Sequence, residues 1–157
     1  MSLARIVSVF GATGLQGGAV VDALLKNGTF VPRAISRDPE SEASKKLKAR
    51  GVEVVKGDPL DKAGLVSALR GSEAVFALTI PVFLLPNMEG KGDLAQGKNI
   101  VDAAKEVGVK FFILSSLPSI SKISGGKYKN VVQHEEKEAL REYLESSGLT
   151  HASPAPS

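Results

Sequence analysis

Apolar and polar residues follow two periodicities along this chain, and these periodicities predict strands and helices in alternation. Short runs rich in β-branched and aromatic residues predict five strands, at about positions 7–10, 30–35, 52–55, 74–79 and 110–115. Apolar residues three or four positions apart predict five helices, one from the turn after position 10 to Asn27 and others at about 39–50, 58–69, 94–107 and 131–147. This alternation predicts an α/β fold, a doubly wound parallel sheet with right-handed crossovers.

The ends of these elements carry recognisable signals. Asp38 is predicted to cap a helix, because it precedes Pro39 as a capping residue precedes the first helical position. Asp58 is predicted to cap the next helix, because a second carboxylate, Asp61, follows three residues later. Two segments interrupt the rhythm, at 80–92 and 116–129. The first is apolar despite its prolines and glycines, so it is expected to pack over something or to cover a pocket. The chain from 149 begins like a strand and is then broken by two prolines.

Three glycines separate the first predicted strand from the first helix, in the spacing G-x-x-G-x-x-G at Gly11, Gly14 and Gly17. The first allows a tight turn, the second allows close backbone approach to a ligand, and the third allows the helix to pack against the strand. Free N–H groups at the helix N-terminus then form a site for a pyrophosphate. A glycine-rich turn without a ligand is the alternative. In the expected strand order, 3-2-1-4-5-6 (the Rossmann fold), ligands bind beyond the carboxyl ends of the strands.

Composition narrows the class of protein. The 157 residues suffice for one hydrophobic core, and 43% apolar and 24% charged residues are typical of a soluble globular domain. The net charge of +3 is scattered along the chain, which argues against direct nucleic-acid binding. No cysteine is present, and the two histidines, His134 and His151, make a metal site unexpected. No signal sequence or membrane-spanning run is apparent, so a cytoplasmic or nuclear location is expected, without membrane contact.

The end of the second strand bears on the choice of dinucleotide. About 20 residues after the glycine turn the chain reads Ser36-Arg37-Asp38. A carboxylate here favours the 2′-hydroxyl of NAD, and an arginine favours the 2′-phosphate of NADP. Because Asp38 suits a helix cap, Arg37 decides the prediction in favour of NADP; a solvated surface arginine is the alternative.

Other candidates lie where later strands end. Asp58 suits a helix cap and could also contact adenine, whereas Thr79 and Ile80 are expected to face the ribose or the nicotinamide. Lys137 lies at the border of an apolar stripe early in the last helix. There it could hold the nicotinamide ribose or act as an acid or base, or simply extend from the edge of that stripe to solvent. The proton-donating motif Tyr-x-x-x-Lys is absent, since neither Tyr128 nor Tyr143 has a lysine four residues later.

Several of these segments together resemble the NmrA-like family, atypical short-chain dehydrogenases related to isoflavone-reductase-type enzymes. The resemblance runs from about Arg5 to Ser153 and is carried by the glycine turn, 36–38, 57–58, 75–79, 96–99 and 137–143. It implies a cofactor site made of Gly11, Thr13, Gly14, Leu15, Gln16, Arg37, Asp58, Thr79, Ser115 and Lys137, and it supports NADP. Family members include NADP-binding redox sensors and transcriptional regulators as well as reductases of small molecules.

The resemblance also sets expectations for the whole chain. Residues 1–153 are expected to form the NAD(P)-binding domain and 154–157 a tail. The family's C-terminal substrate lobe is expected to be missing, as in a truncated or alternatively spliced product. The leading hypothesis is an NADP-binding redox sensor or regulator with little or no turnover, whose protein partner would be a transcription factor. The alternatives are an NADPH-dependent reductase of a quinone, enal or phenolic substrate using Lys137, and a purely structural interaction module.

A final expectation concerns the edge of the fifth strand, Lys110 to Ser115. With the sixth strand short or absent, most of this apolar strand would lack a partner. Exposed edges of this kind pair with other chains. The sequence therefore predicts a homo-oligomer formed through this edge.

Overall fold

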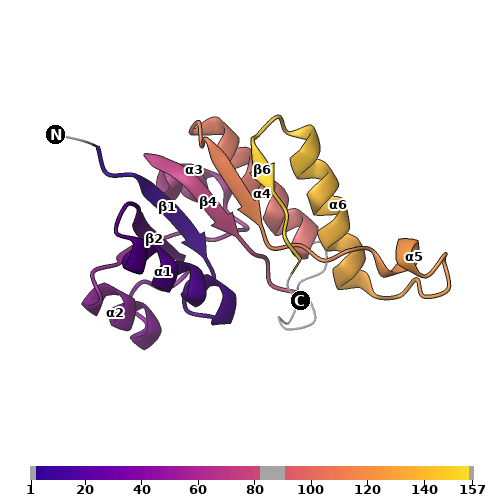
Figure 1. The fold of residues 1–157 in the computed structure, drawn as a ribbon, viewed down its shortest axis with the longest axis horizontal. Helices are drawn as coiled ribbons and strands as arrows, with labels where there is room; N and C mark the ends of the chain where they lie inside the picture. The colour runs from indigo at the N-terminus through magenta and orange to yellow at the C-terminus, as the bar shows by residue number, and fades with distance from the viewer. Residues whose placement is uncertain (1–2, 82–90, 156–157) are drawn as a thin grey trace.

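The computed structural model describes residues 3–81 and 91–155 and confirms the predicted doubly wound fold (Figure 1). Six parallel strands form one sheet in the order β3-β2-β1-β4-β5-β6, as predicted. The strands are β1 Ile6–Phe10, β2 Val31–Ser36, β3 Glu53–Lys56, β4 Ser72–Ala77, β5 Phe111–Leu114 and β6 His151–Ala152. The strand order reverses between β1 and β4, which is where ligands bind in such sheets.

The helices are α1 Leu15–Asn27, α2 Glu42–Ala49, α3 Lys62–Leu69, α4 Asp93–Glu106, α5 Ile120–Ile123 and α6 Val132–Ser146. All of them except α5 cover the sheet through two separate apolar clusters. One cluster joins Val9 of β1 to Val21 of α1 and Leu47 of α2. The other joins β4 and β5 to α3, α4 and α6 through Leu65, Ile100 and Leu140. The clusters bury both sides of the central strands, which explains why those strands are mostly apolar; the buried hydroxyls of Ser8 in β1 and Ser72 in β4 bond to each other at 2.7 Å.

Two predicted helix starts are wrong by three residues, for one shared reason. The N-caps are Ser41, whose hydroxyl accepts from Ser44 N at 3.2 Å, and Asp61, whose carboxylate accepts from Gly64 N at 3.0 Å. The predicted caps Asp38 and Asp58 each accept instead from the backbone N–H two residues later. Each aspartate precedes a proline, and this pair forms a local turn that delays the helix.

The prediction that most of β5 lacks a partner strand is also wrong. β6 pairs with β5 in the register Phe112↔His151 and Ile113↔Ala152. Flanking hydrogen bonds extend the pairing, because Phe112 N donates to Thr150 O at 2.9 Å and Ser116 N donates to Pro154 O at 3.0 Å. Proline lacks an N–H but keeps its carbonyl, so it can lie on an outermost strand. The proposed reason for self-association through β5 therefore falls away.

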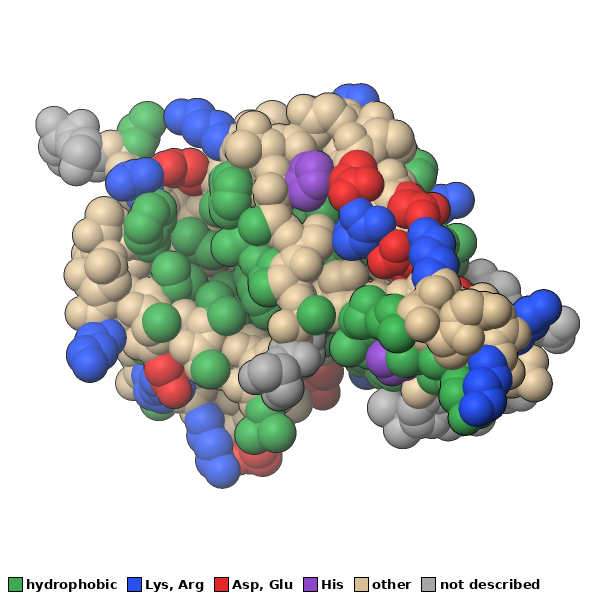
Figure 2. Space-filling view, turned by 45° about the vertical axis from the view of Figure 1, so that its right-hand side comes forward, with side chains coloured by type: hydrophobic (Ala, Val, Ile, Leu, Met, Phe, Trp, Pro, Cys, Tyr) green, Lys and Arg blue, Asp and Glu red, His purple; other side chains and the backbone are tan. Residues whose placement is uncertain are grey.

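The segment predicted to be irregular at 116–129 contains the short helix α5, which extends away from the sheet in Figure 1. Glu135 of α6 holds this segment by accepting hydrogen bonds from Ser119 Oγ at 2.6 Å and Ser121 N at 2.9 Å. Basic and acidic side chains lie side by side in one part of the surface in Figure 2. Ion pairs of this kind join Lys122 of α5 to Glu138 of α6 and Glu138 to Arg141 within α6. These contacts fasten the first half of α6, which carries Lys137.

Two expectations remain, one about the loop at 80–92 and one about membrane contact. The apolar loop predicted at 80–92 falls largely on positions 82–90, outside the described residues. Among the described helices, none combines the length and the apolar character that crossing a bilayer requires.

Gly17 is expected to be irreplaceable, whereas the adjacent Gly18 is not. A Cβ on Gly17 would overlap the Gly11 carbonyl and lie 2.8 Å from Ala12 N, while a Cβ on Gly18 would approach only Ala12 O, at 3.5 Å. Gly17→Ala should therefore lower the free energy of unfolding by about 1–3 kcal/mol, because backbone has to move. Gly18→Ala should raise it by up to about 1 kcal/mol through helix propensity. Denaturant unfolding of both variants measures this; equal effects would contradict the close approach.

Glu138 generates a prediction about pH. The Arg141 guanidinium, followed by the Lys122 ammonium, lowers the pKa of Glu138 from 4.5 to about 2. A depressed carboxylate pKa stabilises the folded state above the ordinary pKa, and this stability is lost as pH falls toward the folded pKa. Glu138→Gln should therefore lower Tm at pH 7, and its difference from wild type should shrink between pH 4.5 and 2. Glu42→Gln, at an exposed pair with Lys45, is the control and should change Tm little.

Candidate cofactor site

The glycine turn after β1 has the geometry that a phosphate site requires. Gly11 adopts a φ of 64°, and Gly14 N donates to Gly11 O at 2.9 Å, which closes the turn. Gly14 is the N-cap of α1, and no side chain caps this helix or places an acidic group in its first turn. The first N–H groups of α1 and the positive end of its dipole therefore remain available to an anion.

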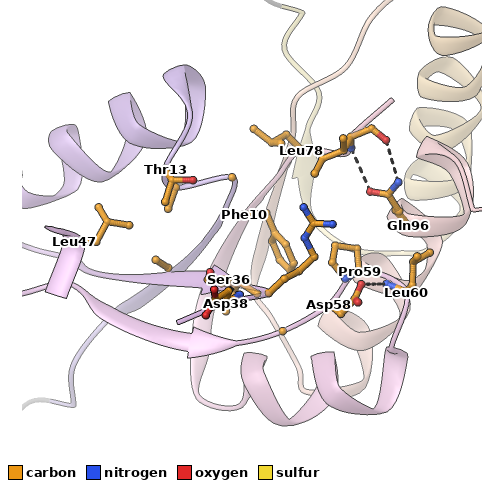
Figure 3. Close-up of a pocket in the computed structure, with 17 residues that line it drawn as sticks. Phe10, Thr13, Ser36, Asp38, Leu47, Asp58, Pro59, Leu60, Leu78 and Gln96 are labelled. Atoms are coloured by element: carbon orange, nitrogen blue, oxygen red, sulfur yellow. Dashed lines mark hydrogen bonds between the residues drawn. The ribbon is translucent and has the colours of Figure 1, made fainter. Parts of the chain in front are cut away.

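A cavity of about 260 Å³ opens beside this turn, at the carboxyl ends of β1, β2 and β4 (Figure 3). Its walls come from four strand ends with the loops that follow them, at 10–13, 34–38, 57–60 and 78–80, and from two helix residues, Leu47 of α2 and Gln96 of α4. The lining residues are Phe10, Gly11, Ala12, Thr13, Ala34, Ile35, Ser36, Arg37, Asp38, Leu47, Gly57, Asp58, Pro59, Leu60, Leu78, Ile80 and Gln96.

The structure brings six of the predicted site residues together around this cavity. They are Gly11, Thr13, Ser36, Arg37, Asp58 and Ile80. The other predicted residues lie outside its lining, in three places. Gly14, Leu15, Gln16 and Gly17 lie at the start of α1, Thr79 and Ser115 follow β4 and β5, and Lys137 lies on α6. The predicted residues thus form a path along the strand ends rather than a single pocket.

Arg37 and Asp38 occupy one wall of the cavity in different ways. The carboxylate of Asp38 accepts from Glu40 N at 3.0 Å, so it is engaged in the local turn. Arg37 is exposed and forms no ion pair with any residue that the structure describes. Arg37 is therefore the cation of this cavity that is ready to bind an anionic ligand.

The first turn of α1 connects the glycine turn to β5. Leu15 is 96% exposed, so it contributes an uncovered apolar surface at the helix N-terminus. Gln16 lies beside it and accepts a hydrogen bond from Ser115 Oγ at 2.6 Å. Ser115 directly follows β5. This bond joins the start of α1, which follows β1, to the end of β5. The two strands lie on opposite sides of the strand-order reversal.

Lys137 is more deeply buried than its border position on α6 predicts. It is 9% exposed, and its ammonium donates to Thr79 Oγ1 and Asp93 Oδ1, both at 3.0 Å, and to Thr79 O at 3.4 Å. The Thr79 hydroxyl donates to the same oxygen of Asp93. Thr79 therefore points into this buried cluster rather than into the cavity.

Two contributors to the site, Asp93 and Gln96, were absent from the predicted set. Gln96 pairs with both backbone polar groups of Ile80, since Ile80 N donates to its Oε1 at 3.2 Å and its Nε2 donates to Ile80 O at 3.0 Å (Figure 3). Both residues lie in the first turn of α4, facing the carboxyl end of the sheet. One signal in the sequence could have identified them. Asp93 and Gln96 are polar residues one turn apart at the start of a helix face that is otherwise apolar.

The site as a whole can hold an extended anionic ligand. Its parts are an uncapped helix N-terminus, an adjacent cavity and a free guanidinium at the end of β2. The positions match those that hold the pyrophosphate and the 2′-substituent of a dinucleotide in this fold. Gly11 and Gly17 maintain the required backbone approach, because a side chain on either would overlap neighbouring atoms.

Solved structures share this architecture. An NADPH-dependent quinone oxidoreductase (QOR2) from Escherichia coli, complexed with NADPH, is 28% identical with a TM-score of 0.71, covering 92% of this chain and 46% of that one. NmrA, a negative transcriptional regulator solved in complex with NADP, has a TM-score of 0.79 at 21% identity, covering 98% of this chain and 45% of that one. The likeness to NmrA at this identity shows the fold.

Sequence relatives agree with the structures. The NmrA-like family oxidoreductase notA of Aspergillus sp. (strain MF297-2) is 42% identical over 148 residues, which are 92% of this chain and 43% of the relative. The oxidoreductase FrzB of Cladobotryum sp. is 38% identical over 157 residues, covering 96% of this chain and 46% of the relative. The chain thus spans less than half the length of these relatives. Because the model of the NmrA-like family matches residues 4–154, this chain belongs to the NmrA-like family.

Proposed function

We propose that this chain binds NADP(H) and acts as a redox sensor or regulatory protein with little or no turnover. The observation that carries the proposal is the free guanidinium of Arg37 in a cavity that adjoins the uncapped N-terminus of α1. An anion is favoured at both places, and in this fold these are the places that hold the pyrophosphate and the 2′-phosphate of a dinucleotide.

Each part of the ligand has a matching group. The N–H groups of the first turn of α1 bind the pyrophosphate, and Arg37 binds the 2′-phosphate with its planar fork. Asp58, Leu60 and Ile80 line the part of the cavity that receives the adenosine. When bound, NADPH supplies a hydride. The family neighbours solved with NADPH or NADP support this assignment.

The absence of a recognisable proton donor favours sensing over turnover. The sequence has no Tyr-x-x-x-Lys. The ammonium of Lys137 is directed to Thr79 and Asp93 within the protein. A sensor needs only to bind the two redox forms of its cofactor differently and to present that difference to a partner. We propose a transcription factor as that partner, as the resemblance to the NmrA-like family implies, and we expect a cytoplasmic or nuclear location.

A second candidate is an NADPH-dependent reductase of a quinone, enal or phenolic compound. It is favoured by the relatives, whose names describe oxidoreductases, and by the quinone oxidoreductase among the neighbours. In this candidate Lys137 would assist proton transfer to the substrate.

A substrate screen separates the two candidates. NADPH consumption with quinones, enals and phenolic compounds is compared between wild type and Lys137→Ala. The sensor predicts the same background rate for both proteins. The reductase predicts turnover by wild type that falls at least about 100-fold in the variant, which is the lower range for the loss of an acid or base.

The cofactor preference depends on one residue. Arg37→Ala should weaken NADP(H) binding by about 2–4 kcal/mol, because a charge-assisted, bidentate contact with the 2′-phosphate is lost. NAD(H) binding should remain nearly unchanged, since NAD has no phosphate there. Fluorescence titration with NADPH and NADH measures both affinities.

Lys56→Ala provides the matched control. Lys56 ends the neighbouring strand β3 in register with Ser36 but does not line the cavity, so its loss changes the net charge equally. Equal losses for both cofactors in Arg37→Ala would show that Arg37 acts by stacking. No binding of NADP(H) to wild type at millimolar concentration would refute the proposed function itself.

A further inference from the structure

Three polar side chains from three different elements meet directly behind the wall of the cavity. Thr79 follows β4, Asp93 begins α4, and Lys137 lies in the first half of α6. Their exposed fractions are 5%, 0% and 9%. Burial of a lysine and an aspartate is costly unless they are paired. Lys137 pairs with Asp93 Oδ1, whereas Asp93 Oδ2 has no hydrogen-bond partner among the described residues.

The ammonium of Lys137 is fully used by this cluster. A lysine ammonium has three N–H donors, and those of Lys137 have three acceptors: Thr79 Oγ1 and Asp93 Oδ1 at 3.0 Å, and Thr79 O at 3.4 Å. No donor is left for a reacting molecule. A lysine ammonium has donors and no acceptor, so this group acts here only as a hydrogen-bond donor to the protein.

Asp93 is held by the same helix from two sides. Its side chain pairs with Lys137, and its backbone N donates to Glu136 Oε2 at 2.9 Å. Consecutive residues of α6 thereby fix the start of α4. From the start of α4, Gln96 holds the Ile80 peptide, which is part of the cavity wall.

We propose that Lys137 is a positioning residue and that Asp93 is its partner. Together they hold the backbone at Thr79 and Ile80, so that the wall of the adenosine cavity is in place before the cofactor binds. Lys137 acts on the cofactor through this wall and donates no proton to a substrate. The inference rests on the proposed function, because the cavity is taken to receive the adenosine of NADP(H).

Binding of two ligands tests this inference. NADPH carries the nicotinamide, whereas adenosine 2′,5′-bisphosphate occupies the adenosine end alone. If Lys137 and Asp93 support the wall, Lys137→Met and Asp93→Ala should each lower the affinity for both ligands by the same factor, about tenfold. The double variant should be no worse than either single variant, because the two residues act as one unit. Weakening of NADPH alone, in Lys137→Met alone, would overturn the inference.

Leu144→Ala is the matched control for general destabilisation. Leu144 is fully buried on α6, two turns beyond Lys137. This variant should lower Tm as the others do but leave both affinities unchanged. If Leu144→Ala lowers the affinity for both ligands as much as Lys137→Met does, Lys137 has only a structural role and the inference is wrong.

Amide hydrogen exchange separates failure of this inference from failure of the proposed function. Exchange at Ile80 N–H reports directly on the wall and needs no ligand. It should accelerate at least about tenfold in Lys137→Met and Asp93→Ala but not in Leu144→Ala, matching the affinity change. If wild type binds neither ligand, the proposed function fails while this measurement still decides the inference. Unchanged exchange in both variants would refute it.

Discussion

The contact on which this structure depends is the approach of α1 to the turn that precedes it. Gly17 lies so close to the Gly11 carbonyl that no side chain fits between them. This approach sets where α1 begins, and so where its uncapped N–H groups point. It also fixes α1 against β1, the strand from which the sheet extends in both directions. The ligand site and the centre of the fold therefore depend on the same backbone contact.

Helix α4 supplies the second organising element, because it supports the other side of the strand-order reversal. The β4 strand ends at Ala77, and Thr79 and Ile80 follow it outside any strand that the structure describes. Side chains hold them instead: Asp93 accepts from the Thr79 hydroxyl, Lys137 donates to the Thr79 carbonyl, and Gln96 pairs with both backbone polar groups of Ile80. Burying these polar groups without partners would be costly, so the start of α4 makes an irregular cavity wall stable.

Two cations near the carboxyl ends of the strands show how environment decides chemical role. Arg37 is exposed beside the cavity, and its neighbouring carboxylate is occupied by a backbone N–H. Lys137 is buried and surrounded by acceptors from Thr79 and Asp93. A free guanidinium can bind a phosphate, whereas a fully coordinated ammonium can only stabilise its surroundings. Their charges are equal, but only Arg37 is available to a ligand.

The sequence by itself determined the sheet, its strand order and the strand ends at which the candidate site lies. Alternating periodicities and the glycine turn are local signals, and the parallel alternation allows few topologies, so Gly11 and Arg37 could be placed at neighbouring strand ends. Only the tertiary structure decided the helix caps at Ser41 and Asp61, since several nearby residues could cap equally well. Tertiary structure alone also revealed the pairing of β6 with β5 and the burial of Asp93 against Lys137. Those features join residues tens of positions apart, and no local pattern specifies which distant group a side chain will meet.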